Sequence, residues 1–210
     1  MTTDLQTRPL TARGKATRIR IVQAAAKLVY TQGARRTSLD EIMESSGTSK
    51  SQLYHYFGNK DALLRAVIQL QTGRVMQAQA PHLQQLDSMT GLRRWRDALV
   101  AISESHQGVG GCPIGSLASE LADHSESARA LLLDGFKIWE SYLVSGLRAI
   151  SARGELSADA DPVDLATATL CALQGGLLLA QTRRSARPVA LALDMAIDNI
   201  ARYVRSGDAS

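Results

Sequence analysis

The sequence predicts an all-α protein of about nine helices, arranged as a basic N-terminal domain followed by a larger helical body. Apolar residues recur at the i, i+3, i+4 and i+7 spacing of helices along most of the chain, and no segment shows the alternation typical of a strand. Residue types that cap helices precede these stretches. With 45% apolar residues among 210, the chain can bury a substantial hydrophobic core.

The first predicted helix ends at about Gly33. Glycine can end a helix because it has no side chain to restrict its backbone. The apolar face of this helix follows the spacing of one helical side and consists of Val22, Ala25, Ala26 and Val29.

Two short helices are predicted next, each opened by a capping box. Ser38 and Glu41 form the first box, and Ser49 and Gln52 form the second only eleven residues later. Gly47 suits the tight turn between the two helices. A long helix followed by two short helices across a glycine turn forms a helix-turn-helix, whose second helix can enter the major groove of DNA.

Basic residues concentrate in the first part of the chain. Residues 1–60 contain ten lysines and arginines but four acidic residues, whereas residues 61–210 contain fourteen and sixteen. This imbalance favours a polyanion-binding domain over residues 1–60, made of an N-terminal arm and the helix-turn-helix, and a separate domain over residues 61–210. Charge alone is equally compatible with a solvated basic face.

The helix that follows Ser49 has two different faces. Leu53 and Phe57 are one turn apart and are expected to pack inward. Another face can hydrogen-bond to DNA, through Lys50, Ser51, Tyr54 and His55. Alternatively, the tyrosines of this stretch are ordinary half-buried side chains.

The predicted helix-turn-helix resembles that of TetR-type transcriptional regulators over residues 37–64, TSLDEIMESSGTSKSQLYHYFGNKDALL. The positions that fit the family motif are Ile42, Gly47, Ser49, Leu53, Tyr54, Tyr56, Phe57, Lys60 and Leu63. Two positions depart from it. Thr48 replaces the small aliphatic residue usual in the turn, which weakens the core slightly, and Ser51 stands where glycine or alanine is frequent.

The resemblance implies two classes of contact with double-stranded DNA. Phosphate contacts would come from Tyr54, Tyr56 and Lys60, with Thr37 or Ser38. Base contacts would come from Lys50, Ser51, Gln52 and His55. Backbone or minor-groove contacts before the first helix could come from Arg13, Lys15, Arg18 and Arg20, although a merely solvating arm is an equal alternative.

Six further helices are predicted in the rest of the chain. The fourth is capped by Asn59 and runs toward Pro81, and the fifth runs from Asp87 or Ser88 to about His106. The remaining four are a sixth from Pro113 to Leu121, a long seventh from Ser125, an eighth capped by Asp161, and a ninth after Arg187-Pro188.

Nine helices fit the TetR architecture, in which residues 61–210 would bind a ligand and dimerise. The last two helices of such proteins usually pair with a second subunit, which implies interface residues Gly175, Gly176, Leu179, Ile197 and Ile200. As an alternative, the glycine pair packs inside one subunit. A symmetric homodimer presents two recognition helices, so its operator should be an approximate palindrome.

The segment GVGGCPIGSLASEL, residues 108–121, resembles a Gly-Cys-Pro segment found in one branch of TetR-like regulators. It lacks the lysine of a Walker phosphate loop, so no nucleotide is expected there. Cys112 stands at a predicted helix N-terminus, where the helix dipole could favour a thiolate and make the protein a redox or electrophile sensor. The favoured interpretation is a small residue that lines the ligand pocket.

Candidate pocket residues are chosen by their place on helices that line ligand cavities in this family. They are Trp95, His106, Cys112, Ser116, Glu120, Phe136, Trp139, Tyr142 and Gln174. For the aromatic members, ordinary core is the favoured alternative. The four histidines have no metal-ligand spacing and the two cysteines fit no zinc or disulfide pattern, so neither a metal nor a cofactor is expected.

Together these observations predict a ligand-responsive, DNA-binding transcriptional repressor of the TetR type. A small-molecule effector would release the homodimer from its operator. The N-terminus lacks the apolar run of a signal peptide, so a cytoplasmic protein without membrane association is expected. The alternatives are a thiol sensor, an enzyme with Cys112 as nucleophile, which lacks a visible base, and a helical carrier, which leaves the basic domain unexplained.

Overall fold

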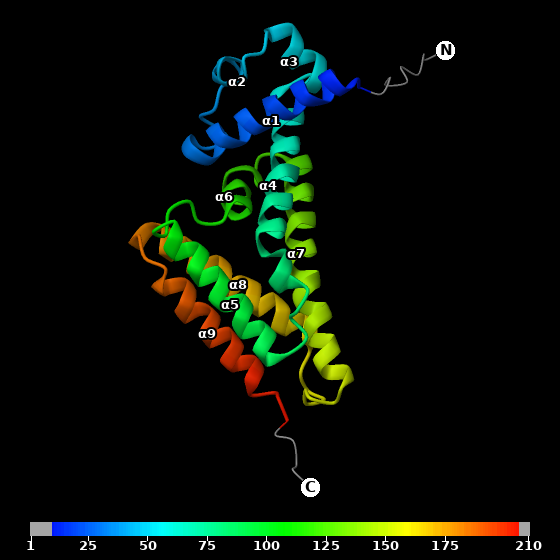
Figure 1. The fold of residues 1–210 in the computed structure, drawn as a ribbon, viewed down its shortest axis with the longest axis vertical. Coiled ribbons are helices and arrows are strands. Elements are labelled where there is room, and N and C mark those ends of the chain that lie inside the picture. The colour runs from blue at the N-terminus through cyan, green and yellow to red at the C-terminus, as the bar shows by residue number, and fades with distance from the viewer. Residues whose placement is uncertain (1–9, 206–210) are drawn as a thin grey trace, which may run out of the picture. The chain divides into compact units, whose positions relative to one another are not determined.

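The computed structural model describes residues 10–205, and these residues form nine α-helices (Figure 1). Within that range no strand is present, and Leu156 and Val204 form an isolated antiparallel bridge. The chain divides into two compact units, one ending at Leu70 and the other beginning at Gln71. The division falls inside α4 (Lys60–Leu83), whereas the sequence analysis placed the domain boundary at the start of this helix.

The first unit contains α1 (Ala12–Gln32), α2 (Leu39–Ser46), α3 (Lys50–Phe57) and the beginning of α4. Both predicted capping boxes are confirmed. The Ser38 and Ser49 side chains each accept a hydrogen bond from a backbone amide three residues on, and Glu41 and Gln52 accept from the serine amides in return. These two boxes explain why such short helices begin where they do.

The second unit contains α5 (Met89–Ser105), α6 (Pro113–Leu121), α7 (Glu126–Ala152), α8 (Pro162–Arg183) and α9 (Arg187–Ala201). The predicted starts of α5 to α8 are confirmed, whereas α9 begins at Arg187 and not after Pro188 as predicted. Ser88, Cys112, Ser125 and Asp161 are the N-caps of α5 to α8, and each accepts a backbone hydrogen bond.

The core of the second unit is built on α8, which packs against α7 and α9, while α5 packs against α9 (Figure 1). The indole rings of Trp95 and Trp139 are almost fully buried. The Trp95 Nε1 donates to Gln79 Oε1 at 2.9 Å, so this buried polar group is satisfied.

The basic residues expected before the first helix lie on it instead. Helix α1 already begins at Ala12, so Arg13, Lys15, Arg18 and Arg20 are helical. The Arg18 guanidinium lies 5.2 Å from the centre of the Phe57 ring, and Arg20 Nε donates to the carbonyl of Ser46 at 2.7 Å. These two arginines therefore stabilise the helix-turn-helix. The arm residues before Leu10 lie outside the described residues.

Two residues expected at a dimer interface are core residues of a single chain. Ile197 and Ile200 are 3% and 0% exposed on α9. A methyl group on Gly176 would lie 3.0 Å from the Cα of Val189, so this glycine allows α8 and α9 to approach within one subunit. The alternative that the sequence left open, a glycine packed inside the subunit, therefore holds for Gly176. No neighbouring atom lies within 4 Å of the equivalent position at Gly175.

Among the described helices, α8 is long and apolar enough to cross a membrane, judged by length and composition alone. The core helix of a soluble protein has the same composition, and one side of α8 is buried against α7 and α9.

Candidate nucleic-acid interface and ligand cavity

The turn between α2 and α3 positions the candidate recognition helix. Gly47 adopts the left-handed conformation, with φ of 60°, which favours glycine because a side chain would be strained there. Thr48, the residue that departs from the family motif, is buried, and its hydroxyl shares a 2.7 Å hydrogen bond with that of Ser46. The polar replacement is thus compensated inside the turn.

Helix α3 is fixed by an inward apolar pair, as its spacing predicts. Leu53 is 0% and Phe57 is 6% exposed. Gly58 ends the helix with φ of 66°, and Asn59 Oδ1 then accepts from the Ala62 amide to cap α4. Leu53 and Phe57 hold one side of α3 in the core, and both of its ends are fixed. The side opposite these two residues is therefore presented to solvent.

The solvent-facing side of α3 brings together the side chains predicted to meet DNA bases. They are Lys50, Ser51, Gln52 and His55, all exposed. Tyr54, which is predicted to contact a phosphate, is also 44% exposed. The Gln52 carbonyl oxygen accepts from the Ser49 amide at 3.0 Å, so this end of the side chain is occupied by the capping box. Only its Nε2 amide then remains to donate to a base.

Tyr56 and Lys60 occupy less open positions. Tyr56 is half-buried, its ring stacks edge-on against His55 at 5.0 Å, and its hydroxyl would lie 3.5 Å from a methyl group on Gly14. Lys60 Nζ donates to the carbonyl of Arg35 at 3.4 Å, in the turn between α1 and α2. Both side chains are thus held by contacts within this unit.

Thr37 does not face solvent and is removed from the candidate contacts. Its side chain is 0% exposed, and its hydroxyl donates to the carbonyl of Gly33 at 2.7 Å. Ser38 is exposed, but its hydroxyl lies 2.8 Å from a carboxylate oxygen of Glu41. The capping hydrogen bonds from Ser38 hold the pKa of Glu41 below its ordinary value, so a negative charge persists beside this hydroxyl.

Sequence reasoning missed two arginines in this region. Arg35 and Arg36 are exposed in the turn that precedes α2, and the Arg35 carbonyl is the group that holds Lys60. An adjacent basic pair directly before a capping box was a usable signal for a cationic turn, which the structure places next to Lys60.

A cavity of about 500 Å³ lies among α6, α7 and α8 in the second unit. It brings together four of the predicted pocket residues, Cys112, Ser116, Phe136 and Gln174. The lining residues that sequence reasoning missed include Ser119, Leu178 and Gln181. They are of mixed polarity and lie on helices whose cavity-facing side cannot be distinguished by periodicity alone.

The other predicted pocket residues do not line this cavity. Trp95 and Trp139 belong to the core, and His106 is exposed at the end of α5, where its Nδ1 lies 2.8 Å from the Ile102 carbonyl. Tyr142 and Glu120 are half-buried outside the lining. The alternative that aromatic residues at helical spacing form plain core therefore holds for both tryptophans.

The environment of Cys112 disfavours a reactive thiolate. Burial raises the pKa of this thiol, and the hydrogen bond from the Gly115 amide opposes the rise only in part. The Gly115 amide donates to Sγ at 3.3 Å. The helix N-terminus thus supplies a capping bond, but desolvation is the larger effect. This geometry supports the interpretation of Cys112 as a lining residue.

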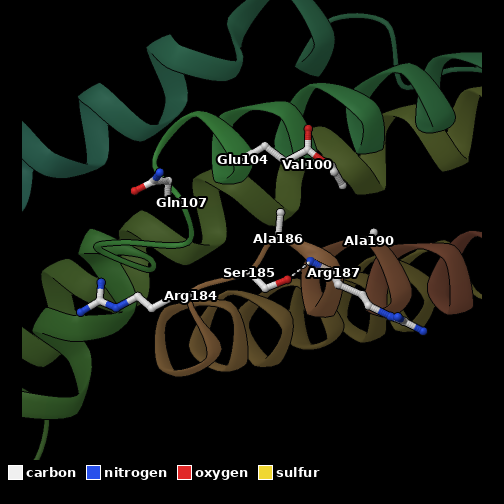
Figure 2. Close-up of a pocket in the computed structure, with 8 residues that line it drawn as sticks. All are labelled: Val100, Glu104, Gln107, Arg184, Ser185, Ala186, Arg187 and Ala190. Atoms are coloured by element: carbon white, nitrogen blue, oxygen red, sulfur yellow. Dashed lines mark hydrogen bonds between the residues drawn. The ribbon is translucent and has the colours of Figure 1, made fainter.

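A second hollow, of about 620 Å³, lies between the end of α5 and the turn that joins α8 to α9. Figure 2 shows that its two arginines, Arg184 and Arg187, extend in opposite directions from that turn. Ser185 Oγ is occupied by the Arg187 amide at 3.3 Å. In an anion-binding site the positively charged groups point toward one position, and these two guanidinium groups do not.

Metal ligation has no support among the described residues. Within residues 10–205, no group of three or more His, Cys, Asp or Glu side chains could hold a metal ion. The two cysteines of this range, Cys112 and Cys171, are both free.

Comparison with known proteins gives two family matches. A model described as "Bacterial regulatory proteins, tetR family" matches residues 21–67, which include the helix-turn-helix. A model described as "Tetracyclin repressor-like, C-terminal domain" matches residues 88–196, which include the cavity.

Individual relatives extend over most of the chain. The uncharacterized HTH-type transcriptional regulator YxaF of Bacillus subtilis (strain 168) is 28% identical over 184 residues, covering 87% of this chain and 93% of the relative. The HTH-type transcriptional regulator LmrA of the same strain is 27% identical over 174 residues, covering 82% and 90%. A crystal structure of a TetR transcriptional regulator from Chloroflexus aurantiacus is 25% identical and covers 93% of this chain and 99% of that chain, with a TM-score of 0.80.

Proposed function

Because the chain belongs to the TetR family of bacterial transcriptional regulators, we propose that it is a cytoplasmic repressor that a small molecule releases from a palindromic operator. The observation that supports DNA binding most directly is the solvent-facing side of α3. Five polar side chains are accessible there on a helix whose opposite side is fixed in the core.

The proposed contacts divide by chemistry. Lys50, Ser51, Gln52 and His55 read base edges, with Gln52 acting as a donor. Phosphates are bound by Tyr54, Tyr56, Lys60 and the added Arg36. Ser38 is a weaker phosphate candidate because its hydroxyl and the Glu41 carboxylate are neighbours.

Homodimerisation through α8 and α9 is supported by apolar side chains that these helices expose. Leu178, Leu179, Leu191 and Met195 are each between 46% and 65% exposed. Exposed apolar side chains gathered on neighbouring helices are typical of a protein interface. In the proposed interface these exposed side chains take the place of the buried Ile197 and Ile200. Leu179 and Gly175 keep the role that was predicted for them.

Release is proposed to follow a shift in population. An effector bound in the body stabilises a dimer whose two recognition helices no longer match the half-sites, and affinity for DNA falls. The cavity lined by Cys112, Phe136 and Gln174 is the proposed effector site. A nucleophilic role for Cys112 has no support, because none of the residues lining this cavity is an ionisable base.

A gel-shift experiment tests this function on DNA from the region upstream of the protein's own coding sequence. We expect a shifted complex that survives an excess of unrelated competitor DNA and dissociates when an active effector is added. A shift that unrelated DNA removes completely would contradict a sequence-specific regulator. A specific complex that strengthens transcription in a reconstituted assay would contradict repression while leaving DNA recognition intact.

A further inference from the structure

The cavity among α6, α7 and α8 contains no charged lining group. Its residues, all within the described chain, include no Asp, Glu, Lys, Arg or His. Its one ionisable group, the Cys112 thiol, has a raised pKa and is neutral at physiological pH. A charged ligand would find no counter-ion among these residues to offset the part of its hydration that it loses on binding.

Apolar and hydrogen-bonding surfaces are both present in the same cavity. Phe136 and Leu178 provide apolar lining. The hydroxyl of Ser119 already donates its proton to the Gly115 carbonyl at 3.1 Å, so it is not free to donate to a ligand. The Gln174 Nε2 atom is buried and has no hydrogen-bond partner in the described chain. A buried donor without a partner costs free energy, and a ligand acceptor would recover it.

The Gln174 side chain reaches this position because residue 115 is glycine. A methyl group there would lie 2.8 Å from Gln174 Oε1 and 3.3 Å from the Cβ of Cys112. Gly115 thus leaves room for the carboxamide beside the start of α6. The carboxamide of Gln174, which extends from α8, therefore lies against the start of α6 at the cavity.

We propose that this cavity selects an uncharged, mainly apolar molecule that carries a hydrogen-bond acceptor, and that the Gln174 amide donates to that acceptor. The inference rests on the proposed function, because it names the chemical class of the effector for the same site. It assigns Gln174 as the residue that distinguishes a molecule with an acceptor from a hydrocarbon of the same shape.

Three matched probes test the proposal on the full-length protein. Benzophenone is neutral and carries one carbonyl, diphenylmethane lacks the carbonyl, and 4-benzoylbenzoate adds a carboxylate. Affinity is measured by calorimetry. We expect benzophenone to bind about 2- to 10-fold more tightly than diphenylmethane, the contribution of one hydrogen bond. The carboxylate should bind at least tenfold more weakly than benzophenone.

Two variants assign the preference to a residue. Gln174→Met keeps the side-chain length and removes the donor, so benzophenone and diphenylmethane should bind equally while diphenylmethane affinity is retained. Gln181→Met is the matched control, because it removes the other lining amide, whose Oε1 lies near Gly111. It should retain the preference for the ketone. Circular dichroism establishes that both variants are folded.

Each remaining outcome contradicts the proposal. Absence of binding by all three probes, equal binding of the ketone and the hydrocarbon, or tighter binding of the carboxylate would overturn the inferred ligand class. Loss of the preference in the Gln181 variant alone would overturn the role of Gln174. The gel shift on upstream DNA is independent of these measurements. If the protein binds its operator but fails the probe test, the inferred ligand class is wrong and the proposed DNA-binding function still stands.

Discussion

Ser46 Oγ and Thr48 Oγ1 lie 2.7 Å apart and share a buried hydrogen bond across the turn between α2 and α3. Thr48→Val removes one partner and should lower the free energy of unfolding by about 1 kcal/mol. The double variant Ser46→Ala/Thr48→Val removes both partners and should lose less than the two single changes combined. Urea unfolding measures all three. Strict additivity would show that the two hydroxyls do not interact.

Lys60 tests the phosphate contacts. Lys60→Ala should flatten the dependence of log K on log salt concentration by about 0.9, because one fewer counter-ion is released from DNA. The matched control is Lys27→Ala, an exposed lysine on α1 that is outside the proposed contact surface. Fluorescence anisotropy with operator DNA over a range of salt gives both slopes. An unchanged slope in the Lys60 variant would show that this residue does not contact a phosphate and only stabilises the turn at Arg35.

The exposed apolar side of α9 tests the proposed dimer. Met195→Glu places a charge on a side chain that is 65% exposed in one subunit, so the fold should tolerate it while the interface does not. Sedimentation at micromolar concentration should then show monomers. Leu133→Glu alters an equally apolar, exposed position on α7 and should remain dimeric. A dimeric Met195 variant would place the interface elsewhere.

The close packing of α8 against α9 at Gly176 should make the protein's stability sensitive to substitution there. A methyl group there meets the Cα of Val189 at 3.0 Å and the Cβ of Ala192 at 3.1 Å, so Gly176→Ala should lower the free energy of unfolding by about 1–3 kcal/mol. Gly73→Ala on α4 has no atom within 4 Å of the new methyl group. It should therefore raise stability by about 0.5–1 kcal/mol. Thermal unfolding of both variants compares these effects, and a stabilised Gly176 variant would contradict the close packing.

The two cysteines provide an internal comparison of thiol reactivity. Burial raises the pKa of Cys112 above its ordinary value of 9.0, whereas Cys171 is exposed. Iodoacetamide at pH 7 should therefore label Cys171 faster than Cys112, as followed by mass spectrometry of the peptides. Because the folded-state pKa is the higher one, the protonated thiol contributes stability below about pH 9, and this contribution is lost as pH rises further. Faster labelling of Cys112 would restore the thiol-sensor alternative.

Local sequence signals predicted the helices well because each signal involves only a few neighbouring residues. The capping boxes at Ser38 and Ser49 and the proline at the start of α6 define helix starts through short-range hydrogen bonds and fixed backbone angles. The inward orientation of Leu53 and Phe57 follows from helical period alone.

Tertiary packing could not be read in the same way. Periodicity indicates that one side of α9 is apolar, but it cannot tell a core residue such as Ile197 from an exposed one such as Met195. Thr37 fits the family pattern for a phosphate contact, yet it is buried because Gly33 ends α1 one turn earlier and accepts its hydroxyl. Two of the aromatic residues proposed for the pocket, Trp95 and Trp139, were wrong for the same reason, because they are core residues, whereas Phe136 lines the cavity.

The central claim is that the exposed side of α3, presented twice by a homodimer, recognises a palindromic operator. DNase footprinting of the upstream region by the full-length protein tests it most directly. We predict two protected half-sites related by approximate two-fold symmetry and about one or more DNA turns apart, both lost in a folded Lys50→Ala/Gln52→Ala variant. Protection of a single half-site, or protection that the variant retains in full, would contradict the claim.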